Sequence, residues 1–212
     1  MSQPGNRGAR VPQPGKLDRS LGEFWVDSPW DIIRQGHNLS CFERDRAYLN
    51  VRGRNFVEIS HLTGTDNDGD GRSVVAGDFR NNGQLDLVLR QAGGGSLLYF
   101  ENRFPQKHYL TVSLGGTRSN RQGIGARLTA TVAGQRLVRE LYPHNTFRSQ
   151  SPNQVHFGLG DATRADHLTI RWPSGKIQEL TDLAADRHVL ISEETEGPAA
   201  VQTLVPGRIP PP

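Results

Sequence analysis

The chain has 212 residues, of which 34% are hydrophobic, and it contains 24 glycines and 13 prolines. This composition favours short strands joined by many turns over long helices. The formal net charge is +3, but the 25 basic residues are interspersed with 22 acidic ones and form no basic run, so no nucleic-acid partner is expected. No run of 18 apolar residues occurs, which excludes a membrane-spanning helix, and the single cysteine, Cys41, excludes an intrachain disulfide.

The N-terminal segment is dominated by proline, glycine, glutamine and arginine, so residues 1–19 are predicted to be a disordered or draped arm. Residues 1–16 lack an apolar core, and no signal peptide is visible in this chain. A short helix is expected to begin at Pro29, with Ser28 as its N-cap. The nearby Trp25 and Trp30 are expected to dock the arm onto a β-core; an aromatic platform for carbohydrate is the alternative.

Residues 20–104 are predicted to form one β-rich unit. From Ala47 the apolar residues alternate with a period of two, which indicates a hairpin over residues 47–59 around Gly53. Further strands are expected near 73–78, 85–90 and 97–101. The run 85–89 is apolar on both faces, which predicts a strand covered on both sides.

An acidic stretch lies between these predicted strands. It reads DNDGDGRSVVAGDFRNNGQLD over residues 66–86. Asp66, Asp68 and Asp70 occupy alternate positions and Gly71 follows, a spacing that wraps oxygen ligands around a hard cation. The alternative is a pair of acidic turns whose carboxylates accept hydrogen bonds from backbone amides.

Residues 105–194 are predicted to form an antiparallel β-sandwich. Short segments with alternating apolar residues recur at 110–114, 128–132, 155–159 and 168–172, and residues 172–176 form a turn signal with Pro173 and Gly175. Residues 195–212 are expected to be an extended or disordered Pro-rich tail. Glu193 and Glu194 fall at the start of this tail, so no buried carboxylate pair for acid–base chemistry is expected.

Two parts of the chain resemble known families. The blocks SNRQGIGAR (119–127), VHFGLG (155–160) and RWPSG (171–175) resemble the signature of the ASPIC/UnbV domain. Upstream, residues 56–60, the Asp-Gly-Asp-Gly of residues 68–71, and residues 78–87 resemble an FG-GAP/VCBS repeat, one blade of an integrin-type β-propeller. The pairing is similar to the C-terminal part of cartilage-acidic-protein-like proteins.

The resemblance implies a mainly β fold: an antiparallel sandwich packed on a single propeller-blade-like sheet, with irregular N- and C-terminal arms. In the FG-GAP repeat, acidic or amide residues at the first, third, fifth and ninth loop positions bind calcium. These positions are Asp78, Arg80, Asn82 and Asp86 in this chain. Arg80 replaces a carboxylate and can pair with Asp78 or Asp86 instead. The calcium ligands that we predict are Asp66, Asp68, Asp70, Asp78, Asn82 and Asp86.

The function that we predict is a non-enzymatic protein-binding or assembly module, as a subunit of a larger complex or by self-association. The sequence has no HExxH metal motif and no Gly-x-Ser-x-Gly elbow, so no enzyme is expected. A lone propeller blade cannot close a ring, and it leaves an edge and a face for a partner. The alternatives are a calcium-dependent extracellular adhesion or glycan-binding module, and a hydrolase that uses the acidic cluster. The resemblance implies an extracytoplasmic location.

Overall fold

A computed structural model describes residues 15–21, 23, 25–35, 43–51, 53–91, 95–144, 147 and 149–204. The predictions for residues 1–14, for Cys41 and for the last eight residues of the tail lie outside these ranges. The chain divides into two compact units, one holding residues 1–73 and 89–98 and the other residues 74–88 and 99–212.

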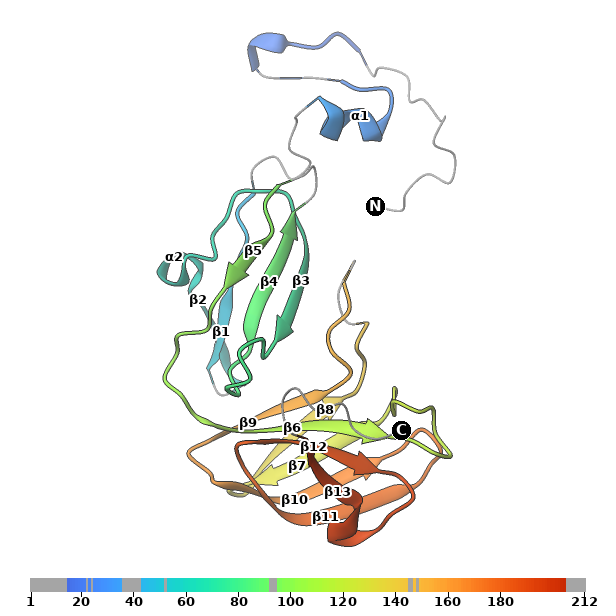
Figure 1. Cartoon of the computed structure of the whole chain (residues 1–212). Coiled ribbons are helices and arrows are strands. Elements are labelled where there is room, and N and C mark those ends of the chain that lie inside the picture. The colour runs from blue at the N-terminus through green and yellow to red at the C-terminus, as the bar shows by residue number, and fades with distance from the viewer. Residues whose placement is uncertain are drawn as a thin grey trace. The chain divides into compact units, whose positions relative to one another are not determined.

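Eight strands of the second unit build a two-layer sandwich (Figure 1). One sheet has the order β11-β10-β7-β8 and the other β13-β12-β6-β9. The strands are β6 (His108–Gly115), β7 (Arg127–Val132), β8 (Gln135–Glu140), β9 (Val155–Gly160), β10 (Arg164–Arg171), β11 (Ile177–Ala184), β12 (Arg187–Ser192) and β13 (Val201–Leu204). The mainly β, sandwich-like fold predicted from the sequence is therefore confirmed.

Alternation along the strands fills the space between the two sheets. In β6, Leu110, Val112 and Leu114 are buried, and the alternating residues of β7, β9 and β10 join them in a single apolar core. The largest side chain in this core is Trp172, which is 1% exposed. The predicted turn after it is present: the N–H of Trp172 donates to the carbonyl of Lys176, and Gly175 adopts φ +90°. That backbone angle favours glycine.

The pairing departs from the prediction at the C-terminal end of the sandwich. β12 runs parallel to β6, with Val189 opposite Val112, whereas every strand was expected to be antiparallel. The ordered chain also continues past residue 194, through the 3₁₀ helix η2 (Gly197–Ala200) to β13, which pairs antiparallel with β12. Composition predicted an extended or disordered tail here, and the outer edge of β12 gives residues 201–204 a regular pairing partner.

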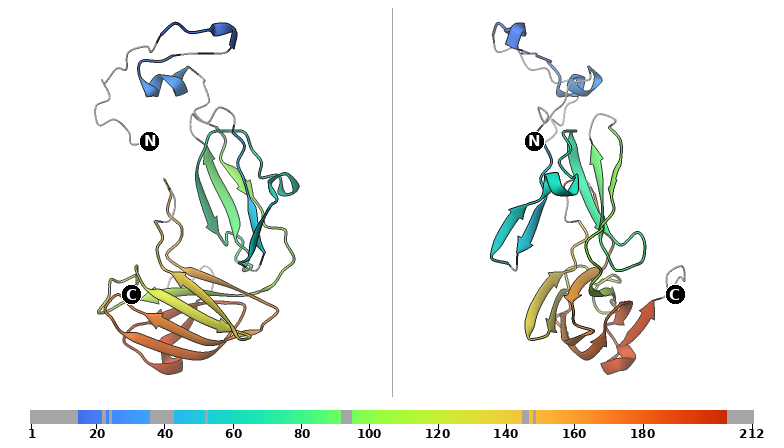
Figure 2. Two further views of the ribbon diagram at one scale, coloured as in Figure 1. Left: turned by 180° about the vertical axis from the view of Figure 1, so that it is seen from behind. Right: turned by 90° about the vertical axis from the view of Figure 1, so that its left-hand side faces the viewer.

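The segment before the sandwich contains two small sheets (Figure 2). β1 (Tyr48–Val51) and β2 (Asn55–Glu58) form the predicted hairpin, and Gly53 at φ +71° lies in its turn. β3 (Gly71–Gly77), β4 (Asp86–Gln91) and β5 (Leu98–Phe100) form a second sheet in that order. The other elements are η1 (Arg19–Leu21), α1 (Pro29–Arg34, which begins where predicted) and α2 (Ser60–Thr63).

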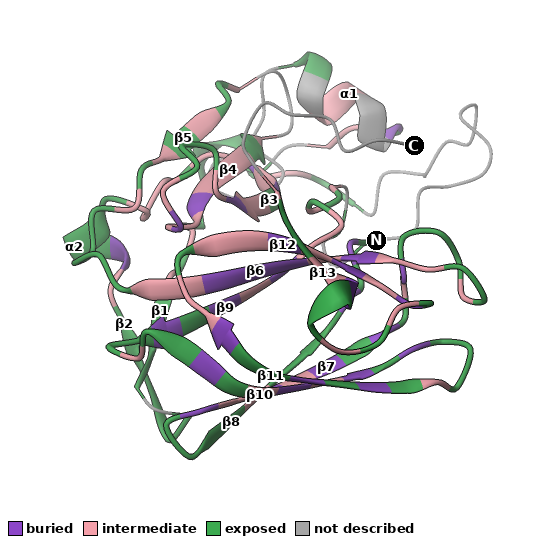
Figure 3. Cartoon of the chain, turned by 60° about the horizontal axis from the view of Figure 1, so that its bottom comes forward, coloured by how far each residue is buried: buried purple, intermediate pink, exposed green. Residues whose placement is uncertain are grey.

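The sandwich and this segment differ in how far their hydrophobic side chains are buried (Figure 3). Among the described residues, every buried hydrophobic side chain lies between Leu110 and Ala200. The strand β4 was expected to be covered on both sides, but Leu87, Val88 and Leu89 are only partly buried. No helix in the described ranges has the length and apolar character to cross a lipid bilayer.

Candidate functional site

The first acidic loop, residues 66–70, is engaged with arginines. Asp66 pairs with Arg44 at 3.0 Å, and Asp70, which is 7% exposed, pairs with Arg72 at 2.6 Å. Asp68 lies between them in the same loop. Asn67 shapes the turn, because its Oδ1 accepts hydrogen bonds from the N–H of Gly69 and from the amide of Gln91.

Asp45 lies beside this loop, and no pattern in the sequence indicated a role for it. A Cβ at Gly71 would lie 2.5 Å from its carboxylate, so the absence of a side chain at Gly71 admits this acid. The Oδ2 atom of Asp45 is buried and has no hydrogen-bond partner among the described residues, and burial raises the pKa of the carboxyl group. A buried carboxylate oxygen without a partner is costly unless a proton or a cation satisfies it.

The second acidic loop, residues 78–86, is organised by its own backbone. Asp78 accepts hydrogen bonds from the N–H groups of Asn82 at 3.0 Å and Gly83 at 2.7 Å. Gly83 adopts φ +83° and lies against the ring of Tyr109, where any Cβ would clash. Asn82 accepts from the N–H of Gln84 through its side chain. These are the hydrogen bonds of an acidic turn, the alternative to calcium ligation at Asp78.

Asp86 is fully buried and surrounded by donors. Both of its oxygens accept from the guanidinium of Arg80, at 3.2 and 3.0 Å. The hydroxyl of Tyr99 and the N–H of Asn102 add bonds of 2.7 and 2.8 Å. Although burial raises the pKa of Asp86, the hydrogen bonds from Asn102, Tyr99 and Arg80 outweigh it, and the net pKa is lowered. The expected pairing of Arg80 with Asp86 is therefore confirmed.

The six predicted calcium ligands therefore lie in two different settings. Both oxygens of Asp86 accept two hydrogen bonds each, from Arg80, Tyr99 and Asn102, whereas the oxygens of Asp78 and Asn82 accept one backbone N–H each. Around residues 66–70, the unpartnered oxygen of Asp45 gives a cation one available ligand. Within the described ranges, no three histidine, cysteine, aspartate or glutamate side chains come together in a group that could hold a metal ion. The calcium assignment stays a prediction.

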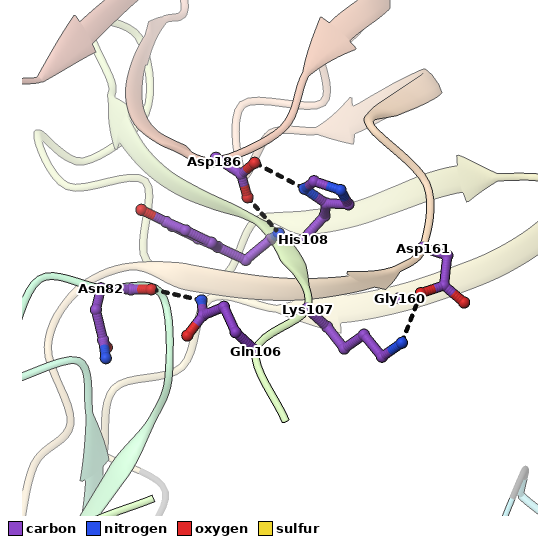
Figure 4. A pocket seen from close by; sticks show the side chains of 8 residues that line it. Asn82, Gln106, Lys107, His108, Gly160, Asp161 and Asp186 are labelled. Carbon is purple, nitrogen blue, oxygen red and sulfur yellow. Dashed lines mark hydrogen bonds and ion pairs between the residues drawn. The ribbon is translucent and has the colours of Figure 1, made fainter. Parts of the chain in front are cut away.

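A polar cavity of about 390 Å³ lies at the start of β6 (Figure 4). His108 Nδ1 bonds to Asp186 at 2.7 Å, Lys107 pairs with Asp161 at 2.6 Å, and the Gln106 amide donates to the carbonyl of Asn82. Asp186 orients the imidazole, as in an acid–base dyad. The described residues that line the cavity include no serine, threonine or cysteine, and Tyr109 supplies a phenolic hydroxyl.

A row of polar side chains crosses the outer face of the β6 sheet. Register places Thr111 between His156 on β9 and His188 on β12. The Thr111 hydroxyl bonds to His156, Ser113 bonds to His188, and the ring of Tyr109 stacks on His156 with centroids 5.8 Å apart. Burial lowers the pKa of both imidazoles, which favours their neutral forms. These histidines are satisfied strand residues that interact across strands.

Glu193 is the most completely bonded carboxylate in the described part of the sandwich. It is 1% exposed, whereas the sequence placed it at the start of a polar tail. The N–H groups of Thr117, Arg118 and Ser119 donate to its Oε2 at 2.8, 3.0 and 2.8 Å. The hydroxyls of Ser119 and Ser174 donate to its Oε1 at 2.8 and 2.6 Å.

The bonds to Glu193 decide its ionisation. Burial alone would raise its pKa, but the hydrogen bonds from Ser174, Ser119 and Thr117 outweigh burial and lower the pKa to about 2. No local pattern in the sequence could have identified this site, because its donors lie 19 to 76 residues away from Glu193.

Comparison with known families gives one match. Residues 116–198, which include β7 to β12, match the family described as ASPIC and UnbV. No curated protein matches the chain in sequence. The three blocks quoted from the sequence lie inside the matched range, whereas the FG-GAP and cartilage-acidic-protein-like resemblances rest on the sequence motifs alone. The resemblance of the sandwich sequence to the ASPIC and UnbV family is thus supported over residues 116–198.

Proposed function

We propose that this protein is a non-enzymatic protein-binding or assembly module, a subunit whose β1–β2 hairpin docks on another protein subunit or on a second copy. We call the exposed apolar side chains of this hairpin the ribbon surface: Tyr48, Leu49, Val51, Phe56 and Val57. The proposal rests on one observation: every residue of β1 and β2 is exposed.

The ribbon surface occupies both faces of the hairpin. Leu49 and Val57 are directly paired, so they share one face, and they are 44% and 50% exposed. Phe56 pairs with Asn50 on the opposite face and is 67% exposed. A two-stranded hairpin by itself is marginally stable in water. A protein that covers both faces would stabilise the strands and remove the apolar area from water.

Neighbouring residues extend the same argument. Twelve of the sixteen exposed large hydrophobic side chains among the described residues lie between Leu21 and Phe104. Single exposed apolar side chains are ordinary in soluble proteins. A region in which no described hydrophobic side chain is buried is unusual. The FG-GAP resemblance fits this reading, because a propeller blade is normally covered by neighbouring blades.

The test compares the purified chain with Phe56→Ser and Val57→Ser, one variant for each face of the ribbon. Ile177→Ser is the matched control, because Ile177 is a 63% exposed hydrophobic residue on β11 of the sandwich. Light scattering across a range of concentrations reports self-association, and native affinity purification from the source cells reports a stoichiometric partner. We expect one of the two in the wild type and the control, and its loss in both ribbon variants.

A wild-type chain that is monomeric at every concentration and that purifies without a partner overturns the proposal. So does an association that the ribbon variants leave unchanged. An extracytoplasmic location is part of the proposal only through the family resemblance, and fractionation of the source cells tests it.

Calcium enters the proposal at one place, the loop of residues 66–70. The support is the buried, unpartnered Oδ2 of Asp45 beside Gly71, together with the alternate spacing of Asp66, Asp68 and Asp70. The cation would neutralise the carboxylates of the loop and make the loop more rigid, and it would have no catalytic role.

A further inference from the structure

The environment of Glu193 has the form of an anion-binding site. Three consecutive backbone N–H groups, those of residues 117–119, point at one oxygen atom. Successive amides that converge in this way form a nest, a concavity that binds anions. Two serine hydroxyls complete the site around the second oxygen.

We propose that this nest is a carboxylate-binding site in its own right and that Glu193 is its resident ligand, held in cis. Removing the Glu193 side chain then leaves a site for a small monocarboxylate anion. The ligand class follows from the donors: five N–H and O–H groups face two oxygens, and every one donates to a carboxylate.

The nest is held in place by bonds that do not involve Glu193. In the loop after β6, the N–H of Gly116 donates to Arg121, and the side chain of Asn120 both donates to and accepts from the backbone of Ile124. Gly116 also approaches Asn120 so closely that a Cβ would lie 2.1 Å from its carbonyl oxygen. The donors are therefore prearranged, which is the condition for binding a free anion without refolding the loop.

The second hydroxyl is fixed by a different turn. Ser174 lies in the 172–176 turn, and its hydroxyl also accepts a hydrogen bond from the N–H of Lys176 in that turn. The N–H of Ser174 donates to the hydroxyl of Ser119, so the turn is bonded to the nest. Lys176 donates to the main-chain carbonyl of Glu193 and pairs with Glu196, which places a cation beside the site.

The site lies where loops from the two sheets of the sandwich meet. The nest belongs to the β6–β7 connection, Ser174 to the β10–β11 turn, and Glu193 to the end of β12, so one carboxylate joins loops from both sheets. The chain beyond Glu193 returns as η2 and β13. Occupancy of the nest therefore anchors the last described strand of the sandwich.

Glu193→Ala is the variant that tests this, because it removes a CH₂ and a carboxylate, which together are the size of acetate. We expect its melting temperature to fall by about 5–10 °C in chloride, from the loss of several charge-assisted hydrogen bonds. Sodium acetate at matched ionic strength is expected to restore at least half of that loss along a saturable curve. Propionate, which is one carbon longer, is expected to restore less.

Three controls separate occupancy of the nest from general salt effects. Wild type and Glu194→Ala, the exposed neighbour, should respond equally to acetate and chloride. Ser174→Ala in the Glu193→Ala background removes one donor and should weaken the response to acetate.

The proposal is overturned if Glu193→Ala melts at the wild-type temperature or responds to acetate and chloride alike. If the variant is unfolded in chloride, recovery of the native tryptophan fluorescence in acetate becomes the measurement. Failure to recover also counts against the site.

Discussion

Two regions of this chain use apolar side chains in opposite ways. From residue 108 onward, alternating residues of eight strands meet in one core, and side chains such as Phe157 and Leu168 are fully buried. Between residues 15 and 104, strands of similar composition leave Phe56 and Tyr48 mostly exposed. The difference teaches that an alternating pattern makes a strand, whereas burial requires a second layer.

The buried polar side chains of the two regions also have different surroundings. In the sandwich, Glu193 and Gln178 tie loops together around a complete core; the Gln178 oxygen accepts from the Trp172 ring at 2.9 Å, and its amide donates to the carbonyls of Ser192 and Thr195. In the preceding region, Asp86 is fully buried and holds its own network of hydrogen bonds, although no described hydrophobic side chain around it is buried. A small region without an apolar core depends more heavily on such polar bonds, and on whatever covers it.

The largest expected effect comes from a matched pair of phenylalanines. Phe157→Ala empties a fully buried core position and should lower the free energy of unfolding by about 3–5 kcal/mol. Phe56→Ala changes a 67% exposed position and should cost less than about 0.5 kcal/mol in the isolated chain. Urea denaturation measures both. Equal losses would show that the hairpin is buried in solution and would break the comparison.

The acid dependence of Glu193 comes next. Its pKa of about 2 lies below the value of 4.5 expected in the unfolded chain. Stability from this group is therefore present above pH 4.5 and is lost as the pH falls toward 2, by about 3 kcal/mol in all. The difference in unfolding free energy between wild type and Glu193→Gln, followed from pH 6 to pH 2, should shrink by that amount. A constant difference would contradict the assigned bonding.

Asp86→Asn tests the polar network of the first region. The change keeps the volume but removes the charge that faces Arg80, so we expect a loss of about 2 kcal/mol, confined to local opening of β4 and its neighbours. Hydrogen exchange of residues 84–91 measures it. Asp161→Asn is the control, because its ion pair with Lys107 is exposed, and no change is expected. Exchange that accelerates throughout the sandwich would mean that the two regions unfold together.

Calcium is expected to give the smallest effect. A site of about 1 mM affinity, as in extracellular calcium modules, adds about 1 kcal/mol at about 5 mM calcium. We expect a rise of a few degrees in melting temperature relative to EDTA, which Asp68→Asn abolishes and Asn82→Ala leaves intact. If calcium does not change the melting temperature, the 66–70 loop is an acidic turn that binds no metal. If Asn82→Ala abolishes the change, the calcium site lies in the second acidic loop, residues 78–86.

The sequence by itself determined the local features of this protein. A period of two at Leu110, Val112 and Leu114 identified a half-buried strand, because side chains alternate between the faces of a sheet. Gly175 marked a turn, because glycine tolerates positive φ. Arg80 in a row of acids indicated an ion pair with Asp78 or Asp86 as an alternative to calcium ligation, and the structure contains the pair with Asp86. Each of these signals acts over fewer than ten residues.

Only the tertiary structure decided the features that join distant segments. The parallel pairing of β12 with β6, the return of residues 201–204 as β13, and the burial of Glu193 depend on partners tens of residues away. The exposure of the ribbon surface was equally hidden, because the apolar residues of β1 and β2 predict strands but do not show whether another layer covers them. Periodicity fixes which face of a strand is apolar, but the free energy of burial depends on whether another layer covers that face.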